Sequence, residues 1–233
     1  MTQQRTNKPA DQTGDHALPR DLIDALGGRF LVFDGPDGSG KSTQLKHFLK
    51  AAKHAGLRIT EVREPGGTEI GERIRDALLT HLDREEMSVR CEMLLYMASR
   101  AQLCEQIIAP ALDRGELVVA DRFVSSTYAY QGAAGGIPFA EIDAAARIAM
   151  QGVMPDATLI FDVDQETAAS RLNPLLDRME AKGAAFHERV RAGYQSLIAG
   201  DAQAQHYLRI DARGDETTVF ANIIDALRAR FVH

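Results

Sequence analysis

The chain has 233 residues, of which 45% are hydrophobic and 26% charged, and its formal net charge is −6. This length and balance fit one globular domain with a sizeable core. A negative chain without a long basic run is unlike a general nucleic-acid binder and resembles a small-molecule enzyme. No apolar run reaches the ~20 residues of a membrane span, and residues 1–20 lack the apolar core of a secretory signal. We therefore expect a cytoplasmic protein with no membrane and no nucleic-acid partner.

Short apolar segments alternate with helical patterns along the chain. The segment LPRDLIDALGG, residues 18–28, is expected to add a short helix before the first strand. The predicted strands are residues 30–34, 58–62, 116–121, 157–164 and 206–211, and the predicted helices are 42–54, 69–80, 86–113, 138–151, 165–172, 178–199 and 215–231. This alternation predicts an α/β fold, a five-stranded parallel sheet with helices on both faces, which binds ligands at the carboxyl ends of its strands.

The domain organisation follows from the same pattern. Residues 29–233 are predicted to form this single domain, because no linker or repeat divides them. Residues 1–28 form an N-terminal extension that we expect to be partly disordered. Cys91 and Cys104 match no metal-binding spacing, and the sequence favours two buried, reduced thiols over a disulfide.

The first predicted strand is followed by G-x-x-x-x-G-K-S, from Gly35 to Ser42, and then by a helix. Strand, glycine-rich loop and helix is the context of a P-loop, so a chance match in a turn is disfavoured. We expect backbone N–H groups to hold phosphate oxygens, Lys41 to reach the β- and γ-phosphates, and Ser42 to bind Mg²⁺. The residues predicted to bind the nucleotide cofactor are Gly35, Gly38, Ser39, Gly40, Lys41, Ser42 and Thr43.

Charged residues also stand at and near the ends of the predicted strands. Asp121 ends an apolar strand and could hold Mg²⁺ through water, although an aspartate in such a place often caps a turn or helix. Beside a P-loop the metal role is favoured. Arg122 follows and could bind a second anion, with a surface salt bridge as the alternative. Asp37 places a carboxylate inside a loop built for anions, and the loop motif alone gives no reason for it.

Four blocks in chain order resemble the bacterial thymidylate kinases. They are GPDGSGKST (35–43), REPGGT (63–68), DRFVSSTYAYQG (121–132) and DRME (177–180), and the resemblance runs from about residue 29 to the C-terminus. It implies a P-loop nucleotide kinase that transfers the γ-phosphoryl group of ATP to dTMP, giving dTDP and ADP with Mg²⁺ in dTTP biosynthesis. It also implies a homodimer, with the long apolar helix as a candidate interface.

The resemblance implies a role for each matching residue. Asp37 would accept a hydrogen bond from the 3′-OH of dTMP, Arg122 would bind the dTMP phosphate, and Tyr130 would crowd the 2′ position. Tyr96 would stack on thymine, and Arg100 would bond the base O4. Glu64 and Pro65 match a segment near the monophosphate, where a cis bond is expected. The predicted substrate-binding residues are Asp37, Glu64, Pro65, Tyr96, Arg100, Arg122, Ser126, Thr127 and Tyr130.

The chain departs from the family in its arginines. Gly38 follows Asp37, so the P-loop carries no arginine, and the lid near residues 171–183 contains only Arg171 and Arg178. Arg178 is predicted to stabilise the transferred phosphoryl group, which makes the predicted catalytic residues Lys41, Arg122, Arg178 and Asp37. Two alternatives stay open: a kinase for another pyrimidine deoxynucleoside monophosphate such as dUMP, and a nucleotide-binding regulatory protein with little turnover.

Overall fold

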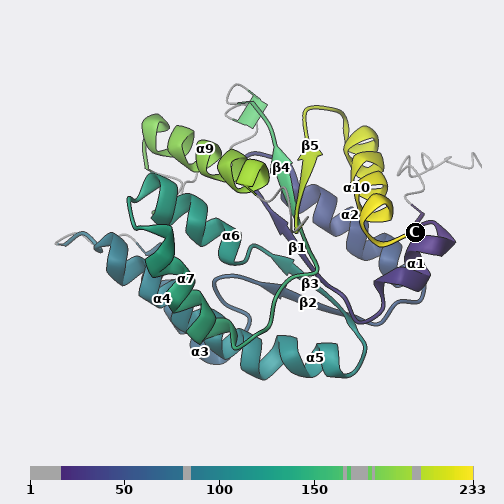
Figure 1. The fold of residues 1–233 in the computed structure, drawn as a ribbon, viewed down its shortest axis with the longest axis horizontal. Helices are drawn as coiled ribbons and strands as arrows, with labels where there is room; N and C mark the ends of the chain where they lie inside the picture. The colour runs from purple at the N-terminus through teal and green to yellow at the C-terminus, as the bar shows by residue number, and fades with distance from the viewer. Residues whose placement is uncertain are drawn as a thin grey trace, which may run out of the picture.

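A parallel sheet runs through the middle of the computed structural model, which describes residues 17–80, 85–164, 167–168, 178–179, 182–200 and 206–232 (Figure 1). Its strand order is β2-β3-β1-β4-β5, and every neighbouring pair is parallel. The strands are β1 (Phe30–Asp34), β2 (Ile59–Arg63), β3 (Leu117–Asp121), β4 (Ala157–Asp162) and β5 (Tyr207–Asp211). The five-stranded parallel α/β fold predicted from the sequence is thus confirmed.

Helices cover both faces of this sheet. They are α1 (Arg20–Leu26), α2 (Lys41–His54), α3 (Glu69–Leu79), α4 (Val89–Leu103), α5 (Ala109–Asp113), α6 (Val124–Thr127), α7 (Phe139–Met150), α9 (Ala184–Gly200) and α10 (Glu216–Phe231), with π-helical turns η1 (Cys104–Ile108) and η2 (Tyr128–Ala134). The buried strand β1 serves both layers. Leu31 and Phe33 pack with α1, α2 and α10, whereas Phe30 and Val32 pack with α4, η1, α5 and α7. Burial on both faces explains why the three central strands, β1, β3 and β4, read as apolar runs.

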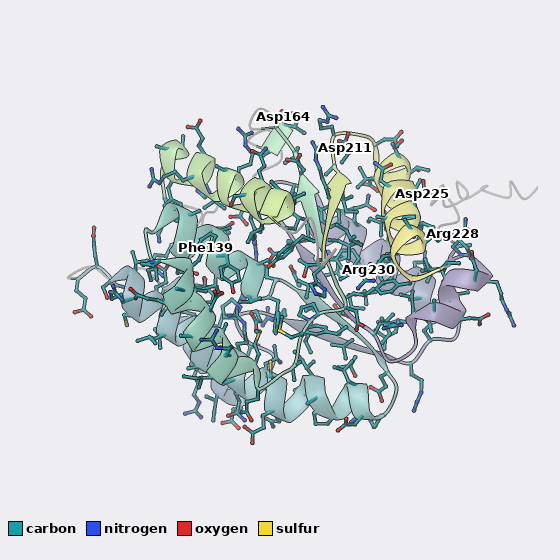
Figure 2. All side chains as sticks on the ribbon, viewed as in Figure 1. Phe139, Asp164, Asp211, Asp225, Arg228 and Arg230 are labelled. Atoms are coloured by element: carbon teal, nitrogen blue, oxygen red, sulfur yellow. The ribbon has the colours of Figure 1, made fainter. Side chains whose placement is uncertain are left out.

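The carboxyl ends of the strands meet at one edge of the molecule. Because β1 and β3 are parallel, with Phe33 opposite Asp121, the P-loop after β1 lies beside the segment after β3. Figure 2 places Asp164 and Asp211 at this same edge, just after β4 and at the end of β5. The loops that carry the predicted site therefore gather along one edge, as expected for an open α/β sheet.

The helical pattern differs from the prediction in two places. The single helix predicted over residues 86–113 begins at Val89, after the capping side chain of Ser88, and changes to a π-helical turn at Cys104. No helix is predicted between residues 121 and 132, but α6 and η2 occupy most of this block. Its polar side chains do not mark a loop, because Ser125 and Ser126 both donate to the buried Asp34.

One further helix boundary shifts by several residues, and one predicted helix cannot be compared. The helix predicted over residues 178–199 begins at Ala184. The one predicted over 165–172 lies outside the described residues apart from 167 and 168. Cys104 is buried as expected, but Cys91 is exposed, so the prediction of two buried thiols is wrong for Cys91. Cys91 lies in the first turn of α4 and is exposed, which a count of cysteines does not reveal.

The described part of the expected N-terminal extension is residues 17–28, which include helix α1. Its Leu22 and Leu26 are fully buried in the layer formed with α2 and α10, and Asp21 pairs with Arg228 of α10 at 2.6 Å. Residues 1–16, the rest of the extension, lie outside the described residues. Within the described part of the chain, none of the helices is long and apolar enough to span a bilayer.

Candidate functional site

The P-loop joins β1 to α2 and ends with Gly40 in a left-handed conformation, with φ at 81°. Gly38 is also left-handed, with φ at 76°, and a Cβ there would lie 2.2 Å from the carbonyl oxygen of Ala168. Both the backbone and the space therefore require glycine at this position. This accounts for the absence of an arginine from the loop, because position 38 has no room for a side chain.

The first cavity lies over the P-loop and has a volume of about 650 Å³. One wall is the loop itself, and the other is the connection between β5 and α10. The Oγ of Ser39 is buried and has no hydrogen-bond partner among the described residues, so the loop holds a polar group that a ligand oxygen could satisfy. Its lining is Pro36, Asp37, Gly38, Ser39, Gly40, Lys41, Ser42, Thr43, Gln44, Arg122, Ala212, Gly214, Asp215, Glu216 and Val219. The predicted loop residues from Gly38 to Thr43 therefore line one cavity.

The second cavity adjoins the first and has a volume of about 300 Å³. Asp37, Lys41, Ser42 and Arg122 line both cavities. The other residues that line the second cavity are Arg63, Glu64, Pro65, Arg75, Leu79, Tyr96, Arg100, Asp121, Phe123, Ser126, Thr127, Tyr130, Gln131 and Met179. The structure thus gathers every predicted substrate-binding residue around one cavity that shares a boundary with the P-loop cavity.

Lys41 and Asp121 form an ion pair at this boundary, in which the Lys41 ammonium donates to Asp121 Oδ1. Burial lowers the pKa of Lys41, and the nearby Arg122 charge adds to this. Burial alone would raise the pKa of Asp121, but Lys41 outweighs it and the pKa is lowered. The Lys41 ammonium is therefore held at the P-loop beside the ionised Asp121 carboxylate.

The oxygen donors present suit a magnesium ion that is shared with phosphates. Ser42 is exposed and, like Lys41, lines both cavities. The Asp121 carboxylate lines the second of them. Hydroxyl and carboxylate oxygens are ligands that Mg²⁺ prefers. Among the described residues, no cluster of three or more His, Cys, Asp or Glu side chains could hold a metal alone. Ser42 and Asp121 thus fit a metal whose remaining ligands are phosphate and water.

Asp37 is bound by Arg122 and Tyr130. Arg122 Nη2 donates to Asp37 Oδ1, and the Tyr130 hydroxyl donates to Asp37 Oδ2 at 2.7 Å. The Arg122 guanidinium carbon also lies 5.4 Å from the centre of the Tyr130 ring. Burial, together with the Asp37 carboxylate, raises the pKa of Tyr130 well above its usual range, so its hydroxyl remains a donor. The carboxylate in the anion loop is thus neutralised by an arginine.

Arg122 is held in place from the other side by Asp34, the fully buried last residue of β1. Asp34 Oδ1 accepts from Tyr194 at 2.7 Å, from Ser126 at 2.8 Å and from Arg122 Nη1 at 3.2 Å. Ser125 donates to the other carboxylate oxygen. Arg122 itself has φ at 68°, which is rare for a residue with a side chain. The network therefore fixes the guanidinium between two carboxylates.

Arg100 and Glu64 form a buried pair on the far wall of the second cavity. Arg100 Nη2 donates to Glu64 Oε2 at 2.6 Å and to Thr127 Oγ1 at 3.2 Å. Burial raises the pKa of Glu64, and the Arg100 charge opposes this. The peptide bond between Glu64 and Pro65 is cis, as the resemblance predicts. Tyr96 lies one helical turn before Arg100 on α4 and lines the same cavity.

Several residues in and around the two cavities were not predicted from the sequence, and four of them are polar groups that support the site. Arg75 of α3 lines the second cavity, donates Nη1 to the Pro65 carbonyl at 2.9 Å, and helps to lower the pKa of Asp121. The sequence could have indicated Arg75, because it lies seven residues, or two helical turns, after Thr68, the last residue of the REPGGT block and the N-cap of α3. The other three are Asp34, Gln131 and Tyr194. Tyr194 lies far along the chain on α9, and no local motif in the sequence indicates that it binds Asp34.

Arg178 is not among the residues that line the two cavities. Its Nη2 donates to Glu92 Oε2 at 2.6 Å, and its Nε donates to the Leu78 carbonyl at 2.6 Å. It lines neither cavity, so in this structure its guanidinium does not face the P-loop. The other lid arginine, Arg171, lies outside the described residues, as do 169–177, 180 and 181. The phosphoryl-binding role of Arg178 stays a prediction.

Comparisons with known proteins give a consistent result. The profile of a family described as thymidylate kinase matches residues 33–223. A thymidylate kinase of Exiguobacterium sp. is 45% identical over 189 residues, which cover 80% of this chain and 88% of the relative. One of Pseudomonas fluorescens is 43% identical, covering 79% of this chain and 88% of the relative. The crystal structure of thymidylate kinase from Ehrlichia chaffeensis superposes with a TM-score of 0.68 at 30% identity, over 87% of this chain and 99% of that one.

Proposed function

Because the chain belongs to the thymidylate kinase family, we propose that it transfers the γ-phosphoryl group of ATP to dTMP. The products would be dTDP and ADP, in a step of dTTP biosynthesis. The observation that carries this proposal is the pair of adjoining cavities, which share Asp37, Lys41, Ser42 and Arg122. A donor over the P-loop and an acceptor in the second cavity would meet at these four residues, where transfer requires them.

The P-loop side would bind ATP. Backbone N–H groups of the loop and the start of α2 would hold the phosphates, and Ser39 Oγ offers an additional polar contact. Lys41 would leave Asp121 and bind the β- and γ-phosphate oxygens, because these phosphates carry more negative charge than one carboxylate. Bound Mg²⁺, held by Ser42 and Asp121, would neutralise charge on those oxygens.

The second cavity would bind dTMP with its phosphate toward the P-loop. Arg122 and Arg75 are the cations that line the cavity near this end, and an arginine fork suits phosphate oxygens. Asp37 would accept from the 3′-OH, which gives a carboxylate in an anion loop its purpose. Tyr130 would fill the space beside the 2′ carbon.

The far end of the second cavity would hold the base. Tyr96 offers a ring for stacking, Arg100 a hydrogen-bond donor for O4, and Thr127 a neighbouring hydroxyl. Glu64 would act through Arg100, because it fixes the guanidinium. Gln131 also lines this cavity, and its amide can contact the base.

Direct in-line transfer fits this arrangement, because phosphoryl transfer depends on positioning and charge stabilisation and needs no covalent nucleophile. Lys41 and Arg122 would stabilise the charge that is shared between donor and acceptor. Asp37 would place the acceptor through its sugar. For Arg178 to join them, its guanidinium would have to leave Glu92.

The proposal includes a cytoplasmic homodimer. Two large apolar side chains support an interface on α3 and α4, since Ile70 is 54% exposed and Leu94 is 57% exposed. Exposed apolar groups on neighbouring helices are typical of surfaces that bind a partner. Light scattering on the purified protein tests this, and Leu94→Glu should yield a monomer if α4 forms the interface.

ADP release, measured in a coupled assay across a panel of nucleoside monophosphates, tests the proposed activity. We expect turnover with dTMP in the presence of ATP and Mg²⁺, and weaker turnover with dUMP, dCMP and the 5-methyl ribonucleotide. A clear preference for dUMP would identify a kinase for another pyrimidine deoxynucleotide. Tight binding of ATP and dTMP without ADP release would identify a nucleotide-binding regulatory protein instead.

A further inference from the structure

Glu92 is a buried carboxylate that the proposed transfer does not use. It lies in the first turn of α4 and is 1% exposed. Three side chains donate to it: Arg178 Nη2 at 2.6 Å, Gln131 Nε2 at 2.8 Å and Lys182 Nζ at 3.2 Å. A carboxylate buried this completely is retained only where donors compensate for the lost water. Two of its three partners come from one short stretch of chain, residues 178–182.

The described residues of this stretch also contact other elements. Arg178 Nε donates to the Leu78 carbonyl at the end of α3. Met179 packs in a buried cluster with Tyr130 and Tyr194. Lys182 adds a cation–π contact, with its ammonium 4.6 Å from the centre of the Phe186 ring at the start of α9. Glu92 therefore joins α4 to a segment that also touches α3 and α9. Loss of its charge would remove the shared carboxylate partner of both cations at once.

The same contacts border the second cavity. Met179, between the two cations, lines that cavity and is 6% exposed. Gln131 lines it as well, and its Nε2 is engaged by Glu92, which leaves its Oε1 as the group available to a ligand. Tyr96, one helical turn after Glu92, is a third lining residue. Glu92 is thus in contact with, or next to, three parts of the wall where the base would bind.

We propose that Glu92 is a positioning residue for the acceptor nucleotide. By binding Arg178, Lys182 and Gln131, it holds Met179 and the Gln131 amide in the wall of the acceptor cavity. Arg178 then serves as an anchor for this wall and acts on the acceptor through Glu92. This inference rests on the proposed function only in naming dTMP as the ligand, because the contacts that carry it join residues of the chain itself.

The competing interpretation is that Arg178 leaves Glu92 to stabilise the transferred phosphoryl group. The two interpretations predict different kinetics. An anchor affects the binding of dTMP, whereas a group that acts in the transition state affects kcat. They also differ in whether the effects of the two substitutions add. If Arg178 is an anchor, replacing it has no further effect once Glu92 has been neutralised.

The experiment compares Glu92→Gln, Arg178→Ala and the double variant with the native protein, and Glu105→Gln is the matched control. Glu105 is an exposed glutamate in η1, immediately after α4. We expect each single variant to raise the KM and the calorimetric Kd for dTMP about tenfold or more, the effect of losing one charged hydrogen bond. The KM for ATP and kcat should stay within a few-fold, and the double variant should be no worse than Arg178→Ala. Glu105→Gln should match the native protein.

Two results would overturn the proposal. One is unchanged dTMP affinity in Glu92→Gln. The other is a fall of kcat by about 100-fold or more in Arg178→Ala with dTMP affinity kept, which is the size expected for a lost transition-state donor. Turnover of dTMP by the native protein decides the proposed function separately, so the two failures are distinguishable.

Amide hydrogen exchange in the ligand-free protein tests the anchor without any substrate. Exchange at residues 178–183 should quicken in Glu92→Gln and Arg178→Ala and stay native in Glu105→Gln, and unchanged exchange in both variants contradicts the proposal. If Glu92→Gln does not fold, Arg178→Lys replaces it. A lysine there keeps the charge but loses the arginine fork, so its dTMP affinity should lie between those of the native protein and Arg178→Ala.

Discussion

The Tyr130 hydroxyl donates a 2.7 Å hydrogen bond to Oδ2 of Asp37. The residue expected to exclude a 2′-OH therefore also orients the residue expected to bind the 3′-OH. Arg122 holds the other oxygen of the same carboxylate. Recognition of the two sugar positions is coupled through one side chain, so the ring and the hydroxyl of Tyr130 should have separable effects.

Substitutions at Tyr130 can separate these effects. Tyr130→Phe keeps the ring and loses the bond to Asp37, so kcat/KM for dTMP should fall about tenfold, or about 1.4 kcal/mol, while the preference for deoxyribose stays. Tyr130→Ala should relax that preference, because the space beside the 2′ carbon opens. Steady-state kinetics with dTMP and its ribonucleotide counterpart measure both. Equal use of the two sugars by the native protein would show that the ring excludes nothing.

Lys41→Met should abolish turnover. The substitution removes the cation expected at the β- and γ-phosphates and leaves the part-buried Asp121 without its partner. ADP release should drop at least 100-fold, or about 2.7 kcal/mol. Lys46→Met, an exposed position on the same helix, is the matched control and should keep native activity. A Lys41 variant with more than about a tenth of the native rate would contradict the P-loop assignment.

Tyr194→Phe should weaken acceptor binding, although Tyr194 lines neither cavity. Its hydroxyl donates to Asp34 at 2.7 Å, and Asp34 in turn holds Arg122. Asp34 keeps several other donors, so we expect the KM for dTMP to rise only about three- to tenfold, from the loss of one hydrogen bond of ~0.5–1.5 kcal/mol. The KM for ATP should not change. An acceptor KM equal to that of the native protein would show that Arg122 needs no support from α9.

The two cysteines should differ in reactivity. Burial, with the Glu64 charge adding to it, raises the pKa of Cys104 to about 12, whereas Cys91 is exposed. At pH 8 the Cys104 thiol is therefore almost entirely protonated and unreactive, because the thiolate is the nucleophile. Titration with a thiol reagent should modify one cysteine in the folded protein and both in denaturant. Cys91→Ser should abolish the reaction of the folded protein, and rapid modification of that variant would place Cys104 at the surface.

The sequence predicted the sheet well, because buried parallel strands have a strong local signal. The apolar runs that form β1, β3 and β4 are determined by neighbouring residues alone. The P-loop is equally local, since its glycines and Lys41 function within one turn of chain. The ranges of the strands accordingly agree within one or two residues.

The parts that were missed depend on contacts between distant residues. No helix is predicted in the block at 121–132, where the polar Ser125 and Ser126 both donate to Asp34, about ninety residues earlier in the chain. The partners of Arg178 could not be predicted either. Glu92 precedes it by eighty-six residues, and no spacing rule connects the two.

The backbone of Arg122 has a consequence for mutational tolerance. Its left-handed conformation, with φ at 68°, costs about 1–2 kcal/mol for a residue with a Cβ, and glycine would remove that cost. Glycine would also leave the buried Asp34 without its cation, and breaking a buried charge pair costs ~3–5 kcal/mol. The larger penalty wins, so every single substitution at position 122 should lower the melting temperature, including the one that relaxes the backbone. Selection for a stable fold alone would thus preserve the arginine, even in a lineage that no longer needed the enzyme.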